Sequence, residues 1–158
     1  MKFLSIDFST TSTGYAFEKD GVTYVGSIGS KAKNVYERTE EIIQGVSDMI
    51  EEYNIEDYFV AIEEPIITFK NRSNINLIRC NGMFLEAVRQ KFNMGFVDVP
   101  NSKWASFNLI KGKRAERKES SIDLLRQSGL VPEEQLNDDM ADAYGIHLYM
   151  KTQGGKGC

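Results

Sequence analysis

The alternation of apolar and polar positions divides the first part of the chain into short strands. An apolar run over residues 3–6 stops on Asp7, and strand character resumes at residues 15–17 after a loop rich in Ser and Thr. The Asp-Gly pair at 20–21 is a strong signal for a two-residue hairpin turn. Residues 22–25 continue as a third strand. This pattern predicts that the first three strands form an antiparallel meander.

The middle of the chain alternates between helical and strand patterns. Apolar residues recur at helical spacing over residues 35–53, and Asn34 is placed to cap that helix. Residues 58–62 form a continuous apolar run, which is typical of a strand buried on both faces and parallel to its neighbour. A second helix is predicted over about residues 75–92, and a fifth strand over residues 95–99.

The last third of the chain carries two predicted helices. One is closed by Gly129, and the other begins at Asn137 or Asp138. The elements together predict an α/β fold with a five-stranded mixed sheet, its first three strands antiparallel, and helices on both faces. We find no repeat or linker, so we expect one domain over residues 1–152 and a disordered tail over residues 153–158.

Composition narrows the class of protein. The chain has 158 residues, which is enough for one domain with a core, and 41% hydrophobic with 27% charged residues is ordinary for a globular protein. A net charge of -4 excludes a uniformly basic DNA-coating protein. One histidine and two cysteines argue against a zinc site or a histidine-based site. Without a signal peptide or an apolar run near 18 residues, we expect a cytoplasmic protein.

Four carboxylates fall at comparable places in this pattern. Asp7 ends the first strand, Glu63 ends the fourth, and Asp139 and Asp142 share one helix face because they lie three residues apart. If the first and fourth strands are parallel neighbours, the last helix can present its aspartates to the two strand ends. Such a cluster repels itself unless cations neutralise it. Oxygen ligands suit Mg²⁺ or Mn²⁺, and two such ions can support hydrolysis of a phosphodiester.

A basic segment lies close in sequence to these acids. Residues 103–118 hold six basic side chains against one acid, Glu116, with Trp104 and Phe107 interleaved. We expect Trp104 to pack in the core, and we expect the basic run to contact phosphates. The residues predicted to bind DNA, with three from the loop over residues 66–74, are Phe69, Lys70, Arg72, Lys111, Lys113, Arg114, Arg117 and Lys118.

The ordered set of acidic motifs resembles the RuvC-type Holliday junction resolvases of the ribonuclease H-like superfamily. The motifs that carry the resemblance are Ile6-Asp7 with residues 9–15, Ala61-Ile62-Glu63, and residues 139–143. The resemblance implies Mg²⁺-dependent cutting of four-way DNA junctions by a homodimer, without an organic cofactor. It implies catalytic and metal-binding roles for Asp7, Glu63, Asp139 and Asp142, and a catalytic role for Lys118. The compact size suggests a phage-encoded or divergent member, acting in bacterial cytoplasm or a phage-infected cell.

Several alternatives stay open at this point. Glu64 follows Glu63 and Asp138 precedes Asp139, so the choice within each pair rests on the motif match. A ribonuclease H acting on RNA–DNA hybrids and a non-catalytic junction-binding protein are the rival functions. A sugar-kinase or actin-like ATPase opens with a similar strand and Thr-rich loop, but it needs two such domains. The second helix is the candidate dimer interface, because it has more apolar residues than one narrow stripe needs.

Overall fold

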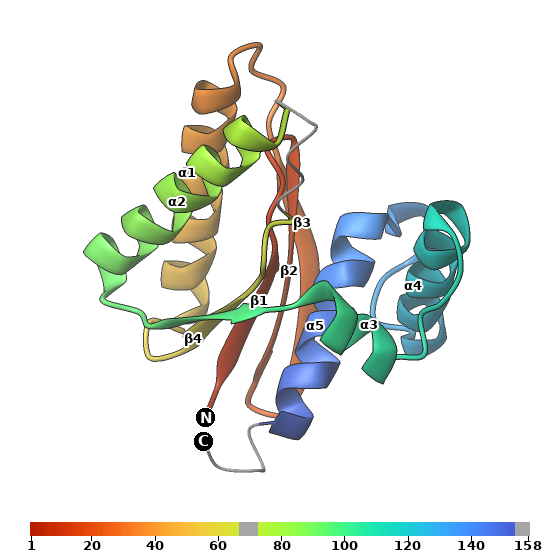
Figure 1. The fold of residues 1–158 in the computed structure, drawn as a ribbon. Helices are drawn as coiled ribbons and strands as arrows, with labels where there is room; N and C mark the ends of the chain where they lie inside the picture. The colour runs from red at the N-terminus through yellow and green to blue at the C-terminus, as the bar shows by residue number, and fades with distance from the viewer. Residues whose placement is uncertain (67–72, 154–158) are drawn as a thin grey trace.

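The computed structural model describes residues 1–66 and 73–153 of the chain (Figure 1). Three of the residues predicted to bind DNA, Phe69, Lys70 and Arg72, lie outside the described residues. The predicted tail lies outside them from residue 154 onward, and the last helix includes Gln153, which the sequence placed in the tail.

Five strands form one mixed sheet in the order β3-β2-β1-β4-β5. The strands are β1 (Phe3–Asp7), β2 (Ser12–Lys19), β3 (Val22–Gly29), β4 (Phe59–Glu63) and β5 (Phe96–Val99). The first three pair antiparallel, whereas β4 runs parallel to both β1 and β5. Asp20 and Gly21 both have positive φ angles, 52° and 78°, as the turn between β2 and β3 requires. The predicted mixed sheet and its antiparallel meander are confirmed.

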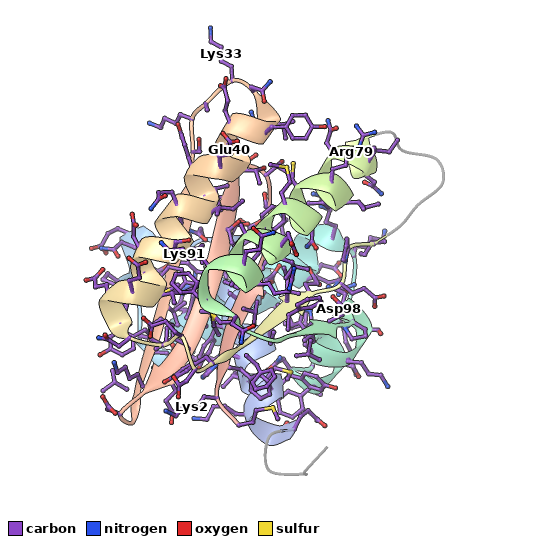
Figure 2. All side chains as sticks on the ribbon, turned by 90° about the vertical axis from the view of Figure 1, so that its left-hand side faces the viewer. Lys2, Lys33, Glu40, Arg79, Lys91 and Asp98 are labelled. Carbon is purple, nitrogen blue, oxygen red and sulfur yellow. The ribbon has the colours of Figure 1, made fainter. Side chains whose placement is uncertain are left out.

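Helices cover both faces of this sheet, as predicted (Figure 1). They are α1 (Val35–Tyr53), α2 (Ser73–Phe92), α3 (Asn101–Phe107), α4 (Arg114–Ser128) and α5 (Asp138–Gln153), with a 3-10 turn at Glu133–Gln135. Helices α1 and α2 lie side by side on one face, and Figure 2 shows Glu40, Arg79 and Lys91 on their outer surface. Helices α3 and α5 cover the other face, and α4 packs on α5. In the described part of the chain, no helix is long and apolar enough to cross a membrane.

The sheet separates two cores, and this separation sets the direction of the strand-end acids. Ile6 and Ile62 are fully buried in the core beneath α1 and α2, whereas Ala61 is fully buried in the core beneath α3 and α5. Successive strand residues point to opposite faces of a sheet. Asp7 and Glu63 therefore point to the face that α3 and α5 cover.

Candidate active site

One open cleft lies between the end of the sheet and helices α3, α4 and α5, with a volume of about 610 Å³. It brings together the four carboxylates Asp7, Glu63, Asp139 and Asp142. Ile6 lies opposite Ile62 in the parallel pairing of β1 with β4, so the next residue of each strand is an acid at the same sheet edge. Helix α5 begins at that end of the sheet (Figure 1). The predicted convergence of the two strand ends with the last helix is confirmed.

A close approach between β2 and α5 brings the acids of the helix to the sheet. Gly14 pairs with Asp7 in the β1–β2 ladder. A Cβ atom on Gly14 would lie only 1.9 Å from the backbone oxygen of Asp139. Asn137 fixes the start of the helix, since its Oδ1 accepts a hydrogen bond of 2.9 Å from the Met140 amide and its Nδ2 donates to Ser27 Oγ at 3.2 Å. The missing side chain at position 14 thus allows α5 to place its acids beside the end of β1.

Burial and mutual repulsion raise the pKa values of three of these carboxylates. Burial raises the pKa of Asp7 well above its usual range, and the charges of Glu63, Asp142 and Asp139 raise it further. Burial raises the pKa of Asp142 to about 6, against the opposing effect of a hydrogen bond from Ser121. Burial also raises the pKa of Asp139. The ionised forms of these carboxyl groups are therefore disfavoured in the cleft, and a bound cation would relieve the repulsion among them.

A hydrogen-bond network holds Glu63. Its Oε1 accepts hydrogen bonds from Asn101 Nδ2 at 2.5 Å and from Trp104 Nε1 at 3.0 Å. Arg117 in turn donates to Asn101 Oδ1 at 2.5 Å. Trp104 is 2% exposed, as its predicted core role requires, and it packs on α5 at Gly145, where a Cβ atom would lie 2.8 Å from the indole ring. The sequence analysis missed this network because its donors lie 38 and 41 residues from Glu63 and carry no motif.

The structure distinguishes the neighbouring acids that the sequence left open. Glu63 lines the acidic cleft, whereas Glu64 is exposed and lines two smaller hollows beside it. Asp138 and Asp139 both line the cleft, but Asp138 forms an ion pair with Lys118. A hydrogen bond from Lys118 lowers the pKa of Asp138, and the same contact raises the pKa of Lys118. Asp138 thus has a cationic partner within the protein, whereas for Asp139 it is mainly the neutral Ser12 hydroxyl that opposes the rise of its pKa.

The basic residues from the predicted DNA-binding set lie along the rim that α4 forms. Arg114, Arg117 and Lys118 line the cleft itself, and Lys111 and Lys113 are exposed in the segment just before α4. The Arg117 guanidinium is directed to Asn101, so part of its donor capacity supports the Glu63 network. These positions put positive charge next to the acidic cluster.

The donor chemistry of the cleft fits a hard divalent cation, because it offers carboxylate oxygens without histidine or cysteine. Across residues 1–66 and 73–153, however, no three His, Cys, Asp or Glu side chains are arranged as a ready metal-binding group. Asp142 is hydrogen-bonded to Ser121, and one oxygen of Glu63 is held by Asn101 and Trp104. Closure of the carboxylates around an ion therefore requires side-chain rotation within the cleft.

Comparison with known proteins places this geometry in context. The sequence profile of a family described as Lactococcus phage M3 protein matches residues 1–152. No curated protein sequence matches the chain. The structure of Thermus thermophilus RuvC in complex with a Holliday junction substrate is similar, with a TM-score of 0.71 and 17% identity over 99% of this chain and 96% of that chain. A second Thermus thermophilus RuvC structure has a TM-score of 0.63 and 17% identity over 98% and 97% of the two chains. The fold is thus that of RuvC, and the predicted ribonuclease H-like class is confirmed.

Proposed function

This chain belongs to the family described as Lactococcus phage M3 protein, and on that premise we propose that it is a structure-selective DNA endonuclease. Its proposed substrate is the four-way junction, and its reaction is metal-dependent hydrolysis of phosphodiester bonds. The observation that carries this proposal is the convergence of Asp7, Glu63, Asp139 and Asp142 in one cleft on a RuvC fold. The similar RuvC structure contains a Holliday junction substrate, which supports branched DNA as the ligand.

The proposed roles follow from the positions of the side chains. The four carboxylates would hold Mg²⁺ or Mn²⁺, with two ions per site, and bound ions of this kind supply charge neutralisation and an activated water for phosphodiester hydrolysis. Asn101 and Trp104 fix one oxygen of Glu63, which restricts its rotamers before any ligand binds. Lys118 lines the cleft and forms an ion pair with Asp138. In the proposed reaction, Lys118 would donate to the scissile phosphate instead.

A nuclease assay tests this function directly. We expect the protein to cut a four-way junction in Mg²⁺ or Mn²⁺ faster than a fork, a linear duplex or an RNA–DNA hybrid. We expect affinity for the junction to fall steeply with salt, because Lys111, Lys113, Arg114 and Lys118 displace counterions from phosphates.

Each rival function has its own signature in the same assay. Strong cleavage in excess chelator would contradict the metal requirement. Preference for the hybrid would identify a ribonuclease H, and junction binding without cleavage in either metal would identify a non-catalytic junction-binding protein.

We further propose that the working unit is a twofold homodimer, because a junction has two equivalent strands to cut and the described part of each chain has one acidic cleft. Helix α2 offers an apolar surface for this contact. Ile75 and Ile78 are 47% and 39% exposed on α2, while Phe84 and Val88 are buried against the sheet. We expect mass measurement at micromolar concentration to give a dimer, and Ile78→Asp to weaken it. A monomer that cuts both strands in one binding event would contradict the dimer.

A further inference from the structure

A separate cavity of about 200 Å³ lies at the opposite end of the sheet from the acidic cleft. The start of β1 and the last turns of α5 meet at this end of the sheet (Figure 1), and Figure 2 labels Lys2 there. The cavity shares no residue with the acidic cleft. Its lining residues are Met1, Lys2, Phe3, Glu18, His147 and Lys151.

His147 is the unusual polar group of this cavity. It is only 3% exposed, and neither Nδ1 nor Nε2 of its imidazole has a hydrogen-bond partner among the described residues. Ser5 Oγ is the other buried side-chain atom without a partner in that part of the chain, but Ser5 does not line the cavity. A buried polar group without a hydrogen bond is costly, and native proteins retain few of them. A ligand that bonds to the imidazole would offset this cost.

The protonation state of His147 defines what such a ligand must offer. Burial and, to a smaller extent, the charge of Lys151 lower the pKa of His147 to about 4, against the opposing effect of Glu18. The imidazole is therefore neutral near neutral pH, so one ring nitrogen donates a hydrogen bond and the other accepts one. A ligand that satisfies both nitrogens must carry an acceptor atom and a hydrogen that it can donate.

The charged side chains around the cavity favour an anion. Lys2 and Lys151 supply two ammonium groups against one carboxylate, Glu18. Lys151 donates a hydrogen bond to Glu18 and lowers the pKa of that carboxyl group, so its negative charge is already paired. Lys2 bonds to Asp57 at 3.4 Å on the surface. An ammonium group has more donors than one hydrogen bond uses, so both lysines keep donors for a ligand.

The size of the cavity restricts the anion to a small one. Its volume of about 200 Å³ lies below the range of roughly 300–1,000 Å³ that is typical of pockets for drug-sized ligands. Hydrogen phosphate is a small ion with acceptor oxygens for the ammonium groups and the imidazole N–H, and with a hydroxyl that can donate to the other ring nitrogen. A phosphate monoester lacks this hydroxyl in most molecules at neutral pH, because its second pKa is about 6.

We propose that this cavity binds free hydrogen phosphate, and that His147, Lys2 and Lys151 recognise the ion. Lys2 precedes β1, whereas His147 and Lys151 belong to the last turns of α5, so the bound ion connects two parts of the chain that are distant in sequence. The site is separate from the proposed nuclease chemistry, and it does not depend on that activity.

The test is direct because the chain has one histidine, so every imidazole signal in an NMR spectrum belongs to His147. Titration of the full chain with inorganic phosphate at neutral pH should shift the imidazole nitrogen and proton signals until they saturate. Phosphate should also raise the thermal unfolding temperature, because it binds the folded protein alone. Sulfate has a similar shape without a hydroxyl at this pH, and at equal ionic strength it should bind at least about tenfold more weakly.

Substitutions separate recognition in the cavity from general attraction of anions. His147→Phe removes both ring nitrogens and should weaken phosphate binding by at least about tenfold, the loss typical of a hydrogen bond to a charged group. His147→Gln, which keeps a donor and an acceptor, should restore part of that affinity. Lys151→Gln should also weaken binding. Lys91→Gln is the matched control, because Lys91 is an exposed lysine of α2 that does not line the cavity, and it should bind as the wild type does.

The titration of the wild-type protein can overturn this assignment without any variant. Imidazole signals that do not move with phosphate, or that move equally with sulfate, would contradict it. Tighter binding of a nucleoside monophosphate than of inorganic phosphate would contradict the choice of the free ion as ligand. Equal stabilisation of His147→Phe and the wild type by phosphate would also contradict the site. None of these measurements uses DNA, so they are independent of whether the nuclease proposal holds.

Discussion

Asp7→Asn should abolish junction cleavage, keep junction binding, and make the metal-free protein more stable. The pKa of Asp7 is raised above its usual range, first by burial and then by the neighbouring carboxylates, so its ionised form is disfavoured in the folded protein. Asparagine removes that charge with little change in shape, and the free energy of unfolding in chelator should therefore rise. The same substitution removes a proposed metal ligand, and we expect the cleavage rate to fall by at least about a hundredfold.

The stability difference between Asp7→Asn and the wild type should change with pH in one direction, which a general packing effect would not reproduce. A carboxyl group whose pKa is raised on folding stabilises the folded state when it is protonated, so its penalty is present above the folded pKa and disappears as the pH falls. Asp142 has a pKa of about 6, and its protonation also removes the repulsion between its charge and that of Asp7. The stability advantage of Asp7→Asn over the wild type should thus shrink as the pH is lowered from about 7 to about 5.

Three measurements test Asp7→Asn: thermal unfolding in chelator, the cleavage rate in saturating Mg²⁺, and the affinity for the junction. Glu64→Gln is the matched control, because it removes one negative charge from an exposed residue outside the acidic cleft. It should retain the wild-type cleavage rate and stability. Asp7→Asn with wild-type cleavage would contradict the catalytic role, and a loss of stability in the metal-free protein would contradict the electrostatic account.

Gly14→Ala should have the largest effect on the fold of the site. The added Cβ would meet the backbone carbonyl of Asp139 at 1.9 Å, and backbone atoms cannot move aside as a flexible side chain can. Relief requires that α5 move away from the sheet or that β2 deform, and such overpacking typically costs about 1–3 kcal/mol. A shift of α5 also carries Asp139 and Asp142 away from Asp7, so cleavage should be lost.

Urea unfolding and the cleavage rate measure the two consequences of Gly14→Ala. Gly82→Ala is the matched control, because a Cβ on Gly82 of α2 meets no atom within 4 Å. Replacing an exposed helical glycine by alanine should raise stability by roughly 0.5–1 kcal/mol and leave cleavage unchanged. If Gly14→Ala matched the wild type in both measurements, the tight contact between β2 and α5 would not control the site.

The sequence by itself determined the five strands and the four longer helices, because their signals are local. Asn34 caps α1 through hydrogen bonds to the amides of Tyr36 and Glu37, and α1 spans the 35–53 range that its apolar spacing predicts. Asp20 and Gly21 form the predicted turn, and Gly129 closes α4 in a left-handed conformation. Acids that end buried strands are also visible in a sequence, since a charge there interrupts an apolar run.

The tertiary structure alone decided what surrounds those acids. Helix α3 follows Pro100 and has only seven residues, so it is too short for a helical period to be recognised in the sequence. It nevertheless supplies both side chains that donate hydrogen bonds to Glu63. Its position depends on Trp104 packing against α5 at Gly145, a contact between residues distant in sequence.

The choice between Glu63 and Glu64 likewise depended on which face of the sheet each side chain meets. Whether a buried polar group has a partner is set by packing across elements, and local sequence patterns do not encode it.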